Sequence, residues 1–185
     1  MTKVSLSIIA LIAFVALSVS SCKKDSAAAP VQTLYDSLGS TTMVADPANS
    51  GKTIEKGRLT IRSIVDSAIF VIAADSKLNG FFKVLLAEVT SGNTSGFQAL
   101  SKNLTDFICV GTGAKNFTYG GKSMVAAHDP AQNSRMNGKA ANADMDQFKV
   151  DLTVAAGKNG VPSTNPAFIS LANIVESLRS QVVQK

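Results

Sequence analysis

Apolar residues recur every three or four positions along most of the chain, which is the spacing of one face of an α-helix. The clearest run is Ile61, Ile64, Val65, Ala68, Ile69 and Ile72. Further substantial runs lie at residues 81–89, 97–108, 145–156 and 168–182, and two short ones at 34–38 and 119–128. No segment alternates apolar and polar residues as a half-buried strand does, and no internal repeat is present. The pattern predicts an all-α single domain.

Turn-forming residues and helix caps separate these runs. Gly39 follows the first short run, and the composition of residues 46–51 is that of a loop. Asp144 is expected to cap the helix that carries Met145. Asn165 followed by Pro166 is a strong start signal, because it combines a capping side chain with a first-turn proline.

The beginning of the chain has the features of a bacterial lipoprotein signal. Lys3 precedes an apolar run from Val4 to Val19, which is too short to span a membrane comfortably. Two small residues and then Cys22 follow, so the Cys22 thiol is the expected site of lipid attachment. An ordinary secretory signal with a chance cysteine is the alternative.

These features divide the chain into three parts. We expect a signal peptide at 1–21, a lipidated tether at 22–32 and the domain at 33–185. The expected location is the bacterial cell envelope, at the periplasmic or surface face of a membrane held through Cys22.

Charge and cysteine content exclude several classes of function. The net charge is +5, but the basic residues are scattered singly, so no nucleic-acid-binding patch is predicted. If Cys22 carries lipid, Cys109 has no disulfide partner, and its apolar neighbours predict a small core residue. Two cysteines and one histidine cannot form a zinc site of the usual kind.

The only histidine, His128, lies at the end of the stretch that begins at Tyr119. Met124 and His128 are four residues apart, so they share one helix face. A neutral imidazole is a good iron ligand, although a lone histidine is more often simply packed or solvated. Gly121, Lys122 and Ser123 resemble the end of a phosphate-binding loop, but the required upstream glycine is missing. No nucleophile elbow of a hydrolase is present either.

The order of motifs along the chain resembles that of the group I truncated haemoglobins. Residues 34–39 resemble the family's opening Leu/Ile-Tyr-x-x-Leu/Ile-Gly-Gly, although Ser40 stands in place of the second glycine, and residues 75–82 resemble its Asp-x-x-Leu-x-x-Phe-Phe motif. Residues 100–108 resemble its distal helix. Tyr119-x-Gly121-x-x-Met124-x-x-x-His128 resembles the motif that delivers its proximal haem ligand. The resemblance covers about residues 33 to 183, with two insertions.

This resemblance implies a truncated globin-like helical fold around a haem pocket that holds haem b (iron protoporphyrin IX) through His128. Phe82 would pack on the face or edge of the haem. The proximal side would be lined by Met124, Phe148 and Leu152, and the distal side by Leu100, Leu104 and Ile108. Each of these residues except His128 is explained equally well as part of the core of an α-helical domain.

The distal positions depart from the family pattern. Ile69 stands where the family usually has a tyrosine, and Leu104 stands where a glutamine is common. Neither side chain can hydrogen-bond to bound oxygen, so tightly held O2 is not expected. An apolar distal pocket suits CO or NO.

Three functions follow as hypotheses. The first is a lipid-tethered haem protein that binds a diatomic gas (O2, NO or CO) and is not an enzyme. The second is a haem enzyme of the same fold, with NO dioxygenase or peroxidase-like activity and a reductase as partner. The third is a haem-free helical lipoprotein that acts as a binding module. The sequence leaves the oligomeric state open.

Overall fold

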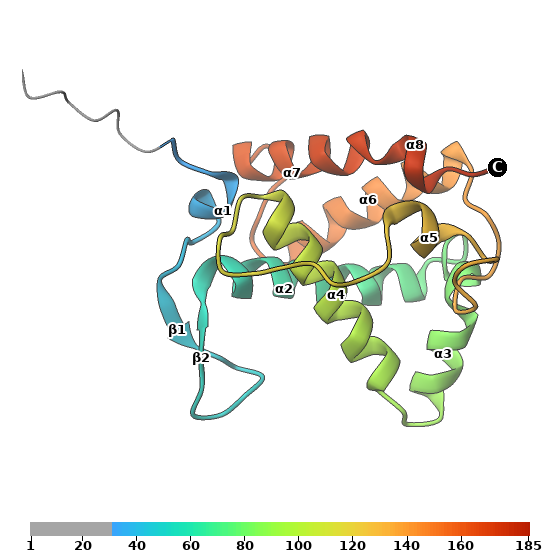
Figure 1. Ribbon diagram of the computed structural model, residues 1–185, viewed down its shortest axis with the longest axis horizontal. Coiled ribbons are helices and arrows are strands. Elements are labelled where there is room, and N and C mark those ends of the chain that lie inside the picture. The colour runs from blue at the N-terminus through green and yellow to red at the C-terminus, as the bar shows by residue number, and fades with distance from the viewer. Residues whose placement is uncertain (1–30) are drawn as a thin grey trace, which may run out of the picture. The chain divides into compact units, whose positions relative to one another are not determined.

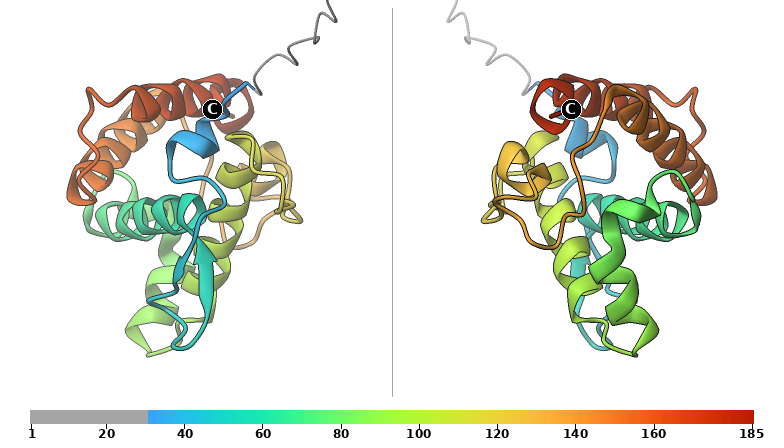
Figure 2. Two further views of the ribbon diagram at one scale, coloured as in Figure 1. Left: turned by 90° about the vertical axis from the view of Figure 1, so that its left-hand side faces the viewer. Right: turned by 90° about the vertical axis from the view of Figure 1, so that its right-hand side faces the viewer.

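A long central helix, α2 (Lys56–Ala74), organises the fold. The computed structural model describes residues 31–185, so the predicted signal peptide, Cys22 and nearly all of the predicted tether lie outside the described residues. α2 packs against α6 (Asn142–Lys158) and against α4 (Ser95–Gly111), as Figures 1 and 2 show. All six apolar residues of the predicted α2 stripe are buried. The helical periodicity of this segment therefore correctly predicted the face that packs.

The other elements are short or lie toward the ends of the described chain. They are α1 (Leu34–Ser37), β1 (Met43–Ala45), β2 (Thr53–Glu55), the 3₁₀-helix η1 (Asn79–Phe82), α3 (Lys83–Thr90), α5 (Met124–His128), α7 (Pro166–Ser177) and α8 (Arg179–Val182). The predicted all-α, globin-like fold class is confirmed. Within residues 31–185, no helix is long and apolar enough to cross a membrane.

The ends of the helices agree with most of the predicted signals. The Asn165 side chain accepts a hydrogen bond from the Ala167 N–H, and Pro166 begins α7. α6 starts before Asp144, whose carboxylate accepts the Ala141 N–H at 2.8 Å, so Asp144 caps from the first turn. The predicted last helix is not continuous, because α7 ends at Ser177 and α8 begins at Arg179.

A β-hairpin, formed by β1 and β2, was not predicted. The two strands are antiparallel, with Val44 opposite Ile54, and the predicted loop at residues 46–51 joins them. Each strand has only three residues. Of the apolar side chains in the two strands, only Ile54 is buried. Strands this short show no alternation that a sequence pattern could detect.

Two hydrophobic clusters lie on different faces of α2. The α4-side cluster has as its buried members Tyr35, Leu38, Ile61, Val65, Ile69, Leu85 and Cys109. The α6-side cluster has as its buried members Ile64, Ala68, Met145, Leu152, Ala155, Ala156, Phe168 and Val175. The burial of Cys109, which has no exposed surface, confirms the prediction of a small core residue.

Candidate functional site

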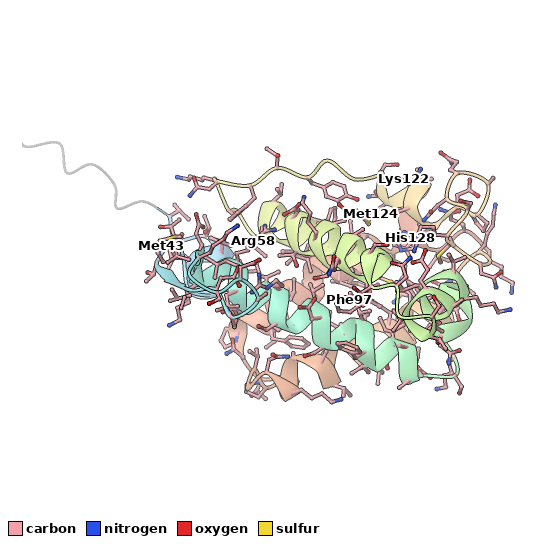
Figure 3. All side chains as sticks on the ribbon, turned by 90° about the horizontal axis from the view of Figure 1, so that it is seen from below. Met43, Arg58, Phe97, Lys122, Met124 and His128 are labelled. Atoms are coloured by element: carbon pink, nitrogen blue, oxygen red, sulfur yellow. The ribbon has the colours of Figure 1, made fainter. Side chains whose placement is uncertain are left out.

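The helix that carries the only histidine is short and well defined at both ends. The Ser123 hydroxyl accepts the Ala126 N–H at 3.2 Å and begins α5. The helix ends at His128, directly before Asp129 and Pro130. Figure 3 shows Met124 and His128 next to each other at the same end of the molecule, with Lys122 nearby. α5 packs against α8.

The His128 imidazole is oriented by the helix itself. Nδ1 lies 2.8 Å from the Met124 carbonyl oxygen. A carbonyl oxygen can only accept, so Nδ1 carries the proton and donates it. In the neutral imidazole this leaves Nε2 without a proton, and that is the form of imidazole that binds a metal. The histidine is half-buried.

A metal at His128 would receive few ligands from the protein. Among residues 31–185, no group of three or more His, Cys, Asp or Glu side chains could hold a metal ion. A metal bound through His128 alone needs a group that brings its own donor atoms. Haem satisfies this requirement, because the porphyrin supplies four nitrogens and the protein supplies an axial ligand.

Gly121 is required by the packing of the segment that leads into α5. A Cβ atom at Gly121 would lie 2.5 Å from the Tyr119 hydroxyl oxygen and 2.6 Å from the ring carbon that carries it. The Tyr119 hydroxyl donates to the Lys122 carbonyl oxygen at 2.6 Å and so closes this turn. The glycine of the Tyr-x-Gly motif is therefore explained by the close approach of the tyrosine ring.

α4 buries its small and polar residues more deeply than its large apolar residues. Its buried residues are small or polar: Gly96, Ser101, Thr105, Asp106 and Cys109. Its large apolar residues Leu100, Leu104 and Ile108, spaced one helical turn apart, are only half-buried. A helix in a closed domain normally buries its large apolar residues most deeply. The apolar face of α4 is therefore suited to covering an additional apolar group.

The structure brings the predicted distal residues together. Ile69 is a buried member of the α4-side cluster, and Phe82, Leu100, Leu104 and Ile108 pack against the same cluster. Both tyrosines of the chain use their hydroxyls elsewhere, because Tyr35 donates to Glu55 at 2.7 Å and Tyr119 donates to Lys122. Burial, together with the neighbouring Glu55, raises the pKa of Tyr35, which therefore stays protonated.

The predicted proximal residues do not all lie in one hydrophobic cluster. Leu152 is buried in the α6-side cluster and Phe148 packs against that cluster. Met124 is half-buried and belongs to neither cluster. Phe148 and Leu152 therefore belong to a different cluster from the predicted distal residues. The structure does not itself assign any of them to a ligand, and their roles stay predictions.

The structure also has a cleft beside the hairpin. It has a volume of about 800 Å³ and is lined by the hairpin, α2 and the polar face of α4, with Phe117 at one end and no contribution from His128. Figure 3 shows Arg58, one of its lining residues, away from His128. Its three basic side chains are engaged within the protein: Arg58 and Lys102 pair with Asp106, and Arg62 pairs with Asp46.

Two side chains that sequence analysis did not single out contact α5 directly. The Asn133 amide donates to the Ala127 carbonyl oxygen at 2.7 Å, and the Gln184 amide donates to the Val125 carbonyl oxygen at 2.8 Å. Asn133 lies in the polar stretch after His128, and Gln184 is the penultimate residue. No local sequence signal distinguishes either residue from an ordinary surface amide.

Comparison with known proteins supports the fold. No protein-family model matches this sequence, and no curated protein does. Among solved structures, the chain is similar to a truncated haemoglobin from Tetrahymena pyriformis in its Fe(III) form. That match has 21% identity and a TM-score of 0.57, and it covers 83% of this chain and all of the other.

A second solved structure gives the same result. The 2/2 haemoglobin from Synechococcus, in its cyanomet state with covalently attached haem, matches at 18% identity and a TM-score of 0.57. The match again covers 83% of this chain and all of the other. At these identities the similarity establishes the fold alone, and the chain has the fold of the truncated haemoglobins.

Proposed function

We propose that this protein is a haem-binding globin of the group I truncated type, which binds a diatomic gas at iron ligated by His128. The haem would be haem b. The physiological partner would be O2, NO or CO.

The half-buried apolar face of α4 is the observation that carries this proposal. Leu100, Leu104 and Ile108 form one stripe, while the other positions of the same helix bury Ser101, Thr105 and Asp106. Full burial of a leucine side chain is worth roughly 2 kcal/mol, so a flat apolar group that covers this stripe would be strongly stabilised. A porphyrin ring is such a group, and the unprotonated Nε2 of His128 supplies its ligand.

Each predicted residue has a defined part in this proposal. His128 holds the group through Nε2, and the bond from Nδ1 to Met124 fixes the plane of the imidazole. Phe148, Leu152 and Met124 exclude water on the proximal side. Phe82, Leu100, Leu104 and Ile108 do so on the other side. When bound, haem iron supplies the coordination site for the gas.

The apolar distal side favours gas binding over an enzymatic role. Ile69 and Leu104 offer no hydrogen-bond donor, and both tyrosine hydroxyls are engaged elsewhere. NO dioxygenation requires O2 to be held and polarised first, and peroxidase-like chemistry requires polar groups beside the iron. We therefore place the reductase-dependent enzyme second and a haem-free binding module third.

Reconstitution with haem tests the proposal. Residues 26–185 are expressed, hemin is added, and ferric, ferrous and ferrous-CO spectra are recorded. We expect a one-to-one complex whose Soret band shifts on addition of CO, and loss of that complex in His128→Ala. A His128→Ala protein with stoichiometric haem and an unchanged Soret band would contradict the ligand assignment. A wild-type protein that binds no haem would leave the fold intact and favour the haem-free binding module.

We also propose that the protein is tethered to the membrane by lipid on Cys22. The support is the signal-like sequence that precedes this residue. Cys22→Ser should move the full-length protein from the membrane fraction to the soluble fraction, and the acyl mass should disappear from the N-terminal peptide. If the wild-type N-terminal peptide carries no lipid, an ordinary secretory signal is the better interpretation.

A further inference from the structure

The ligand-bearing helix α5 is too short to be stable by itself. Isolated helices of fewer than about 12 residues are marginal in water, and α5 spans only Met124–His128. The last carbonyl groups of any helix also lack partners within the helix. The orientation of His128 therefore depends on what the rest of the chain supplies to this one turn.

Side chains occupy three of the carbonyl groups of α5. The Met124 oxygen accepts from His128 Nδ1, the Val125 oxygen from Gln184 and the Ala127 oxygen from Asn133. The last two donors come from outside the helix and from different segments. One lies in the loop at residues 129–141, and the other lies 59 residues after Val125.

Both donors are themselves held in place. The Gln184 backbone N–H donates to the Ala140 carbonyl oxygen at 3.0 Å, and Val183 forms a parallel bridge with Ala140. The 129–141 loop is fixed at a second place, where the Asn137 N–H donates to the Phe81 carbonyl oxygen at 3.1 Å. The Asn137 side chain donates to the Gly80 carbonyl oxygen at 3.0 Å. Figure 1 shows this loop beside the beginning of α3.

The loop therefore connects the two sides of the proposed pocket. One end contacts α5, which carries His128, and the middle contacts η1, which carries Phe82. Arg135 adds an ion pair to Glu88 on α3, with Nη1 2.9 Å from the carboxylate. The C-terminal residues also bind this loop, because the Gln184 N–H donates to the Ala140 carbonyl oxygen.

We propose that Asn133 and Gln184 are positioning residues for His128, which hold α5 from the loop and from the C-terminal tail. This inference rests on the proposed haem ligation. Loss of either amide frees a carbonyl of the single turn, loosens the helix and weakens the bond between His128 Nε2 and the iron. Partners that orient a metal ligand typically change metal affinity about 10-fold to 100-fold when they are removed.

The most specific test replaces each amide by the carboxylic acid of the same shape. Asn133→Asp and Gln184→Glu preserve side-chain volume but replace the donating amide by a carboxylate that repels the helix carbonyl. If Asn133 and Gln184 served only to fill space, these substitutions would have little effect, because the side-chain volume is preserved. Asn93→Asp and Gln181→Glu are matched controls, because each makes the same chemical change and neither side chain forms a hydrogen bond with α5.

The full-length chain, purified in mild detergent, is loaded with hemin. Haem transfer to a scavenging apoglobin and the iron–histidine stretching frequency of the ferrous form are then measured. We expect about tenfold faster haem loss and a lower stretching frequency in both test variants, with both controls unchanged. Wild-type rates and frequencies in both test variants would overturn the inference.

A second measurement separates this inference from the proposed function. Amide hydrogen exchange is measured on the haem-free chain, where α5 should exchange faster in Asn133→Asp and Gln184→Glu than in the controls, with unchanged thermal unfolding. If the wild-type chain binds no haem, the proposed function and the ligand role fall together. Unchanged α5 exchange, with haem binding intact in the wild type, refutes the positioning role alone.

Discussion

The two faces of α4 meet different surroundings. On the polar face, Asp106 accepts from Arg58 at 2.7 Å and from Lys102 at 2.6 Å, and Ser101 donates to Asp66. The Arg58 guanidinium also lies 4.4 Å from the centre of the Phe117 ring, within range of a cation–π contact. On the apolar face, Leu100, Leu104 and Ile108 remain half-buried.

The cleft beside the hairpin lies on the polar side, where the charged groups already satisfy one another. The apolar side is incomplete, because the large hydrophobic side chains Leu100, Leu104 and Ile108 retain exposed surface. A bound group would gain more from completing the apolar side than from displacing existing ion pairs.

The largest expected effect comes from removing the Asp106 carboxylate from the polar face of α4. Asp106 is 5% exposed, and Asp106→Ala leaves Arg58 without its carboxylate partner. Removal of one member of a largely buried pair should cost about 3 kcal/mol of unfolding free energy, measured by urea titration. Asp146→Ala, which removes a solvent-exposed partner of Arg179, is the control and should change little. Equal losses of unfolding free energy in the two variants would mean that the ion pairs of Asp106 do not stabilise the fold.

A smaller effect is expected from adding a donor to the apolar side. Leu104→Gln, in the haem-loaded protein, should slow O2 dissociation about fivefold, because one hydrogen bond is worth about 1 kcal/mol. Stopped-flow displacement of O2 by CO measures this rate. Leu104→Met has similar volume and no donor, so it should behave like the wild type. A Gln variant indistinguishable from the Met variant would place Leu104 away from the ligand.

The two sides should also differ in their response to acid. Burial raises the pKa of Asp106, but hydrogen bonds from Lys102 and Arg58 outweigh it and hold the pKa below its usual range. A lowered folded-state pKa contributes stability above about pH 4 that is lost as the pH falls further. Unfolding free energies of the wild type and Asp106→Asn should therefore differ above about pH 4 and approach each other as the pH falls below it. Parallel curves would assign the acid sensitivity to other carboxyl groups.

The smallest effect concerns Cys109. Burial raises the pKa of its thiol to about 11, and Arg58 opposes this only in part. In the Cys22→Ser chain at pH 8, a thiol-specific chromogenic reagent should therefore react only after denaturation. Rapid reaction of the native protein would mean that the region around Cys109 opens readily, and that the polar side is less stable than its hydrogen bonds suggest.

Several parts of this fold were predictable because they depend on local sequence. The stripe from Ile61 to Ile72 gave the buried face of α2, and Asn165 with Pro166 gave the start of α7. The hairpin was missed, because three-residue strands show no alternation. The break at Leu178 was also missed. Arg179, the next residue, bonds to Asp146 and Asn142 on α6, and no local pattern contains such contacts.

The sequence by itself determined the helical class, the position of the histidine on one turn and the apolar character of Ile69 and Leu104. These properties follow from residue type and spacing, which act over three or four positions. Only the tertiary structure decided which face of α4 is buried, because that depends on Arg58 and Asp66 of α2 as partners. It also decided that Asn133 and Gln184 meet at α5, since hydrogen bonds between distant segments exist only after the chain has folded.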